Sequence, residues 1–109
     1  MAHKIEDQDD FEKKLNEAGA KLVIVCISAT ECDKCAGIEE KLQGLSSRFG
    51  DCDFLEVDAD MTDVADNLGV YEYPTFHFYR NSKQIPEYKV RGADLEELNQ
   101  IGEIIEKLN

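Results

Sequence analysis

The chain has no tryptophan, only two prolines, and no apolar run long enough to span a membrane. Basic residues are also few: 12 lysines and arginines stand against 24 aspartates and glutamates, so the formal net charge is −12 at pH 7. Binding to nucleic acid or to an anionic membrane needs basic patches, so this balance argues against both partners. The 109 residues are enough for one small domain with a single core.

The N-terminus lacks the apolar segment that a signal peptide requires, because residues 1–7 are mostly polar or charged. We therefore expect a cytoplasmic protein. Structural disulfides are rare in that compartment, and closely spaced cysteines there are more often catalytic or metal-binding.

Four cysteines are present, and two of them are closely spaced: Cys32 and Cys35, in the sequence Cys-Asp-Lys-Cys. The pair follows the apolar run 22–27 and precedes a segment of helical periodicity. Two such thiols can close a small disulfide, and a helix N-terminus beside the first would favour its thiolate. Zinc sites use the same spacing, but His3 and His77 are poorly spaced for a zinc finger. We favour a redox role, with a metal site and inert thiols as the alternatives.

Hydrophobic periodicity predicts alternating strands and helices along the chain. Strands are predicted at 22–28, 54–57, 75–79 and 87–91, with Ile5 in a short first strand. Helices are predicted from an Asp9 cap to residue 18, over 33–49, over 62–68, and from an Asp94 cap to residue 108. This order, βαβαβα followed by ββα, predicts a mixed sheet with helices on both faces.

The other two cysteines are predicted to be unpaired. Cys26 lies in a buried strand and is expected to act as a small hydrophobe. Cys52, at the start of the next strand, is expected to be semi-exposed and roughly 13 Å from it, too far for a disulfide. Asp58, Asp60 and Asp63 lack the spacing of a calcium loop, so we interpret them as loop and cap residues.

This order of elements, with C-x-x-C after the second strand, resembles the thioredoxin family. Residues 28–30 precede the first cysteine as in animal members, and residues 54–60 resemble their third strand. Residues 73–76 match the cis-proline loop, and residues 92–93 match the glycine pair before the last helix. The similarity covers about residues 4–108. It implies a single α/β domain over residues 1–109 with the thioredoxin fold, a central mixed five-stranded sheet flanked by four helices.

The resemblance also implies a function, a thiol–disulfide oxidoreductase that reduces protein disulfides. Cys32 would be the nucleophile and Cys35 the resolving thiol, and their redox-active disulfide would serve in place of any cofactor or metal. Tyr73, Pro74 and Gly92 are the implied substrate-binding residues, with Pro74 in a cis peptide bond. The implied partners are protein disulfides and a thioredoxin reductase, and we expect a monomer.

The active-site sequence departs from the family's Trp-Cys-Gly-Pro-Cys. Glu31 replaces the tryptophan, and Asp33 and Lys34 replace the Gly-Pro pair. Cys26 replaces a buried aspartate that is proposed to help deprotonate the second cysteine, and Glu56 in the neighbouring strand is the candidate substitute for that acid. We expect all five positions to modulate the site.

These departures, together with Glu40 in place of a later proline, leave a second function open. It is a thioredoxin-fold binding or adaptor protein with weak or no reductase activity. Such a protein would hold its partner with Tyr71, Tyr73 and the rim around Cys32.

Overall fold

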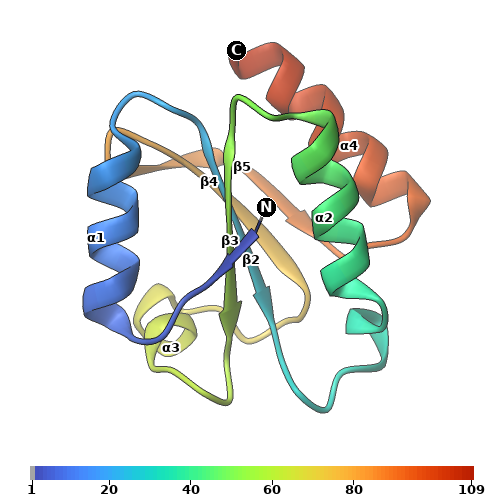
Figure 1. Ribbon diagram of the computed structural model, residues 1–109. Coiled ribbons are helices and arrows are strands. Elements are labelled where there is room, and N and C mark those ends of the chain that lie inside the picture. The colour runs from blue at the N-terminus through green and yellow to red at the C-terminus, as the bar shows by residue number, and fades with distance from the viewer. Residues whose placement is uncertain (1) are drawn as a thin grey trace.

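One five-stranded sheet lies between two pairs of helices in the computed structural model, which describes residues 2–109 (Figure 1). The strands are β1 (Ala2–Lys4), β2 (Val23–Ser28), β3 (Asp53–Asp58), β4 (Thr75–Arg80) and β5 (Lys83–Arg91). The helices are α1 (Gln8–Ala18), α2 (Ile38–Arg48), α3 (Val64–Leu68) and α4 (Leu95–Leu108), with a short 3-10 turn η1 (Asp33–Cys35) before α2.

The strand order is β1-β3-β2-β4-β5. β2 is parallel to β3 and antiparallel to β4. At one edge β1 pairs with β3 in parallel, and at the other edge β5 pairs with β4 in antiparallel orientation. All six residues of β2 are buried, as expected for a β-branched central strand covered on both faces. The prediction of a mixed five-stranded sheet flanked by four helices is confirmed.

Two hydrophobic cores form, one on each face of the sheet. The first lies under α2 and α4, where Leu42 and Ile101 pack with Ile24 and Phe54. The second lies under α1 and α3 and includes Val25 of the central strand. Figure 1 shows the two helix pairs on opposite sides of the sheet. Within residues 2–109, no helix combines the length and apolar character needed to cross a bilayer.

The prediction of one helix over 33–49 is wrong. Residues 33–35 form the separate turn η1, and α2 begins only at Ile38. Gly37 stands between them with φ +70°, a left-handed conformation that a continuous α-helix does not allow. Cys32 therefore caps a three-residue turn, and the N-terminus of the long helix lies further along the chain.

Both edge strands differ from their predicted bounds. β5 begins at Lys83 and not at residue 87, so Pro86 lies inside it. A proline fits there because β5 pairs with β4 alone, and an edge strand has N–H groups that make no ladder hydrogen bond. β1 covers Ala2–Lys4, and Ile5 follows it, donating its N–H to the Glu56 carbonyl at 2.9 Å.

The two predicted caps had different outcomes. The N-cap of α1 is Asp7 and not Asp9, because the Asp7 carboxylate accepts the Asp10 N–H at 2.8 Å. The capping box at α4 is confirmed: Glu97 accepts the Asp94 N–H at 3.0 Å, and Asp94 accepts in return.

Candidate active site

The close cysteine pair lies in the loop that leaves the carboxyl end of β2. Cys32 and Cys35 form a disulfide, with their Cα atoms 5.2 Å apart across η1. Cys32 is half-buried, whereas Cys35 is only 8% exposed. A thiolate must reach its substrate to attack it, so access favours Cys32 as the attacking sulfur.

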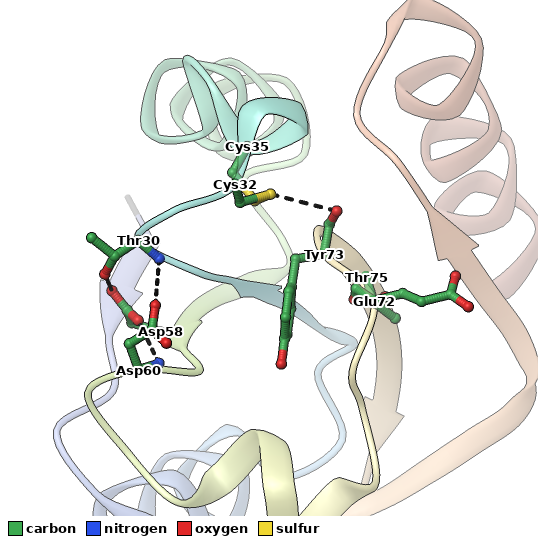
Figure 2. Close-up of a disulfide and its surroundings, with 8 residues drawn as sticks. All are labelled: Thr30, Cys32, Cys35, Asp58, Asp60, Glu72, Tyr73 and Thr75. Atoms are coloured by element: carbon green, nitrogen blue, oxygen red, sulfur yellow. Dashed lines mark hydrogen bonds between the residues drawn. A yellow bond between two sulfur atoms is a disulfide. The ribbon is translucent and has the colours of Figure 1, made fainter.

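The loop before Cys32 is held by two carboxylates at the end of β3. The Asp60 carboxylate accepts the Thr30 N–H at 2.7 Å, and the Asp58 carboxylate accepts the Thr30 hydroxyl at 3.4 Å. Asp58 also accepts the Asp60 N–H at 2.8 Å (Figure 2). The Ala59 N–H donates to the Ser28 carbonyl at 2.8 Å. The carboxyl ends of two parallel strands thus fix the approach to the disulfide.

A cis-proline loop faces the disulfide from the start of β4. The Tyr73–Pro74 peptide bond is cis. The Tyr73 carbonyl oxygen lies 3.5 Å from the Cys32 sulfur, close enough to accept a hydrogen bond from the thiol when the pair is reduced (Figure 2). The Thr75 hydroxyl donates to the Glu72 carbonyl at 2.6 Å, which fixes the loop on its other side.

Gly92 closes the loop from β5. Its N–H donates to the Pro74 carbonyl at 2.8 Å, and its φ of +107° is one that L side chains rarely adopt. A Cβ atom at this position would lie 3.0 Å from a Glu97 carboxylate oxygen.

Together these loops line an open groove of about 500 Å³, which we name the Cys32 groove. Its lining residues are Glu31, Cys32, Asp33, Lys34, Glu72, Tyr73, Pro74, Arg91 and Gly92. The structure therefore brings most of the predicted site residues to one surface. Cys35 lies beneath that surface, and Cys26 and Glu56 lie in the sheet.

Charges of both signs surround the groove. Glu31, Asp33 and Lys34 are exposed beside the disulfide. Across the groove, the Arg91 guanidinium lies 3.6 Å from the Glu72 carboxylate, and both side chains are largely exposed. The carboxylates next to Cys32 oppose formation of its thiolate, and Lys34 favours it.

Cys26 and Glu56 are register neighbours on β2 and β3. Cys26 is fully buried, as predicted, and burial followed by the nearby Glu56 raises the pKa of its thiol far above the ordinary value. It holds its proton at neutral pH. Glu56 is 9% exposed, and burial raises the pKa of its carboxyl, which Lys4 partly offsets. Glu56 is therefore the buried acid beside the position where the family carries its aspartate.

Two of the remaining predictions are corrected. Cys52 is buried and not semi-exposed, because it belongs to the core under α2 and α4. The Asn109 side-chain amide donates a hydrogen bond to its sulfur at 3.5 Å. Tyr71 is 67% exposed but does not line the Cys32 groove, whereas Tyr73 does. Both Cys26 and Cys52 are unpaired thiols, as predicted.

No cluster of three or more potential metal-ligating side chains occurs within residues 2–109. Asp60 lies in a loop, as predicted, whereas Asp58 is the last residue of β3. The contacts of both residues with Thr30 were not predicted. The positions of Glu72 and Arg91 in the groove were also not predicted. One signal was available for the aspartates: β2 and β3 are parallel, so their carboxyl ends meet at one edge of the sheet.

The disulfide joins a partly exposed cysteine to a buried one at the rim of a groove that contains a cis proline. This is the site of a thiol–disulfide oxidoreductase. The chain matches the Thioredoxin family model over residues 2–106. It is 41% identical to thioredoxin of Gallus gallus over 101 residues, which cover 92% of this chain and 94% of the relative. It is 39% identical to thioredoxin of Equus caballus over 99 residues, 90% and 92% of the two chains. The chain belongs to the thioredoxin family.

Solved structures agree with this assignment. Thioredoxin of Fasciola hepatica aligns with a TM-score of 0.87 at 26% identity, covering 98% of this chain and 99% of that one. A chain in the crystal structure of a ferredoxin:thioredoxin reductase and thioredoxin f2 complex aligns with a TM-score of 0.81 at 28% identity. That alignment covers 94% of this chain and 93% of the other.

Proposed function

We propose that this protein is a cytoplasmic, monomeric dithiol carrier that reduces disulfides in other proteins. The observation that carries the proposal is the unequal exposure of the pair, with Cys32 at the groove surface and Cys35 beneath it. The Cys32 sulfur can contact a substrate, while the buried Cys35 sulfur remains available for the second exchange. The groove beside Cys32, lined by Tyr73 and Pro74, offers a place for the substrate's backbone.

The reaction proceeds by two exchanges. The Cys32 thiolate attacks one sulfur of the substrate disulfide and forms a mixed disulfide, and the other substrate sulfur leaves as a thiolate and takes up a proton. The Cys35 thiolate then attacks the Cys32 sulfur, re-forms the internal disulfide and releases the second substrate thiol. Two electrons pass from the protein dithiol to the substrate.

A reductase must return the pair to the dithiol after each cycle. The complex of a thioredoxin f2 with a reductase shows that a thioredoxin fold can dock on such an enzyme. We propose a thioredoxin reductase as the electron donor here. Glu31 stands where the family carries a tryptophan, so a carboxylate replaces an indole ring next to Cys32.

Deprotonation of Cys35 needs an acceptor within the protein. Cys26 cannot serve because its pKa is raised and its thiol stays protonated. We propose that Glu56 accepts this proton, since it is the buried carboxyl in register with Cys26 and burial raises its own pKa.

The test is reduction of insulin disulfides by excess dithiothreitol, with and without the protein. The wild type should accelerate reduction, and Cys32→Ser should abolish the acceleration. Cys52→Ser is the matched control, because it removes a buried thiol outside the groove. No acceleration by the wild type would refute the proposed function and favour a binding or adaptor protein.

A further inference from the structure

A second, smaller pocket adjoins the Cys32 groove. It has a volume of about 200 Å³, and Glu72 and Arg91 line both cavities. We name it the His77 pocket; the side chains that matter here are Tyr71, Glu72, Thr75, His77, Lys89 and Arg91. A chain segment that leaves the groove past Glu72 and Arg91 would reach it directly.

The pairing of β4 with β5 explains why these side chains meet. Thr75 is the register partner of Arg91, and His77 is the register partner of Lys89. Opposed residues of an antiparallel pair project to the same face of the sheet, and residues two apart on a strand share that face. An imidazole and two cations are therefore gathered at one site.

His77 is 4% exposed, and its Nδ1 atom has no hydrogen-bond partner within residues 2–109. Buried polar atoms nearly always have a hydrogen-bond partner, so a buried atom without one indicates that a binding partner is missing. Burial, followed by Lys89 and Arg91, lowers the pKa of His77 to about 4. The ring is thus neutral at pH 7, and its surroundings carry positive charge.

The two cations are poorly compensated. Lys89 makes no ion pair in the part of the chain that the structure describes, and Arg91 has only a long contact of 3.6 Å with Glu72. This is unusual in a chain with a net charge of −12, where acidic side chains outnumber basic ones two to one. The pocket offers positive charge and a ring nitrogen, and its volume of about 200 Å³ suits a single side chain.

We propose that the His77 pocket binds a carboxylate side chain, aspartate or glutamate, of the substrate protein near its attacked cysteine. This inference rests on the proposed function, because it gives the same groove a specificity. The incoming carboxylate would replace Glu72 at the Arg91 guanidinium and lie between Arg91 and Lys89. Glu72 is therefore its competitor, and Glu72→Gln should strengthen binding.

The test uses the only two histidines of the chain as probes. Ten-residue peptides carry serine in place of the attacked cysteine, with glutamate or glutamine at each position on either side. Each peptide is titrated into the oxidised protein while the ring resonances of His77 and His3 are followed by NMR. At one position, the glutamate peptide should shift the His77 signals and bind about three- to ten-fold more tightly than its glutamine counterpart. His3, exposed on β1, should not respond.

Lys89→Gln should remove most of that preference. Lys83→Gln is the matched control, because it makes the same charge change on the same strand outside the pocket and should keep the preference. Equal binding of the two peptides at every position, or a preference that survives Lys89→Gln, would overturn the proposal. Binding to the oxidised protein needs no turnover, so this result is independent of whether insulin is reduced.

Discussion

Replacing Cys26 with aspartate should speed the second exchange, in which Cys35 resolves the mixed disulfide. Cys26 is fully buried and protonated at neutral pH, so the wild type lacks a base at this position. The only nearby acceptor that we propose is Glu56, which belongs to the adjacent strand. A carboxyl at position 26 would supply the missing acceptor.

The size of the effect follows from the neighbouring strand. Parallel strands lie about 4.8 Å apart, so the new carboxyl and Glu56 would compete for one proton, which keeps one ionised and raises the pKa of the other. A positioned general base contributes about 10²- to 10⁴-fold. Because Glu56 already supplies part of this, we expect resolution to become about 10- to 100-fold faster. Burial of a carboxyl in place of a thiol should lower the free energy of unfolding by about 1–3 kcal/mol.

The assay is a single turnover with a disulfide peptide, quenched with acid at short times, with the mixed disulfide counted by mass spectrometry. Cys26→Asn is the matched control, since it has the same shape as the aspartate variant and cannot accept a proton. Glu56→Gln should slow resolution in the wild-type background. Equal resolution rates for Cys26→Asp and Cys26→Asn would refute the reasoning.

Three further predictions concern charge, pH and backbone. Replacing Glu31 with glutamine should speed alkylation of Cys32 by iodoacetamide at pH 7 about three- to ten-fold. One carboxylate at about 6 Å, in an effective dielectric of ~40, opposes a thiolate by roughly 1.4 kcal/mol, and an unchanged rate would contradict this. Because folding lowers the pKa of His77 from 6.5 to about 4, the unfolded chain binds the extra proton between these values. The free energy of unfolding should fall by about 3 kcal/mol as the pH drops through that window, and His77→Gln should lack this part of the loss in urea titrations. Gly92→Ala should lower the free energy of unfolding by about 1–3 kcal/mol because of its positive φ, whereas Gly44→Ala in the interior of α2 should raise it by about 0.5–1 kcal/mol.

Local sequence patterns predicted the sheet and the helices well, because the spacing of apolar residues shows which faces of a strand or helix are buried. The unbroken apolar run of β2 indicated burial on both faces, and Asp94 with Glu97 indicated a capped helix. The break before α2 was not predictable from periodicity. Cys35 and Ile38 keep a helical spacing, and only the left-handed conformation of Gly37 separates η1 from α2.

Contacts between distant segments were the least predictable part of the site. The hydrogen bond from Thr30 to Asp60 joins residues 30 positions apart, and the hydrogen bond from Asn109 to Cys52 joins residues 57 positions apart. The meeting of His77 with Lys89 depends on the register of the β4–β5 pair. None of these contacts can be predicted from the local sequence, because each joins residues that only the folded chain brings together.

The central claim is that Cys32 attacks the substrate and Cys35 resolves the product, and trapping tests it most directly. A Cys35→Ser variant, incubated with a disulfide-bonded protein, cannot resolve the mixed disulfide. The account predicts that one substrate chain accumulates on the variant, and that peptide mapping places it on Cys32. No adduct, or an adduct on Cys26 or Cys52, would contradict the account.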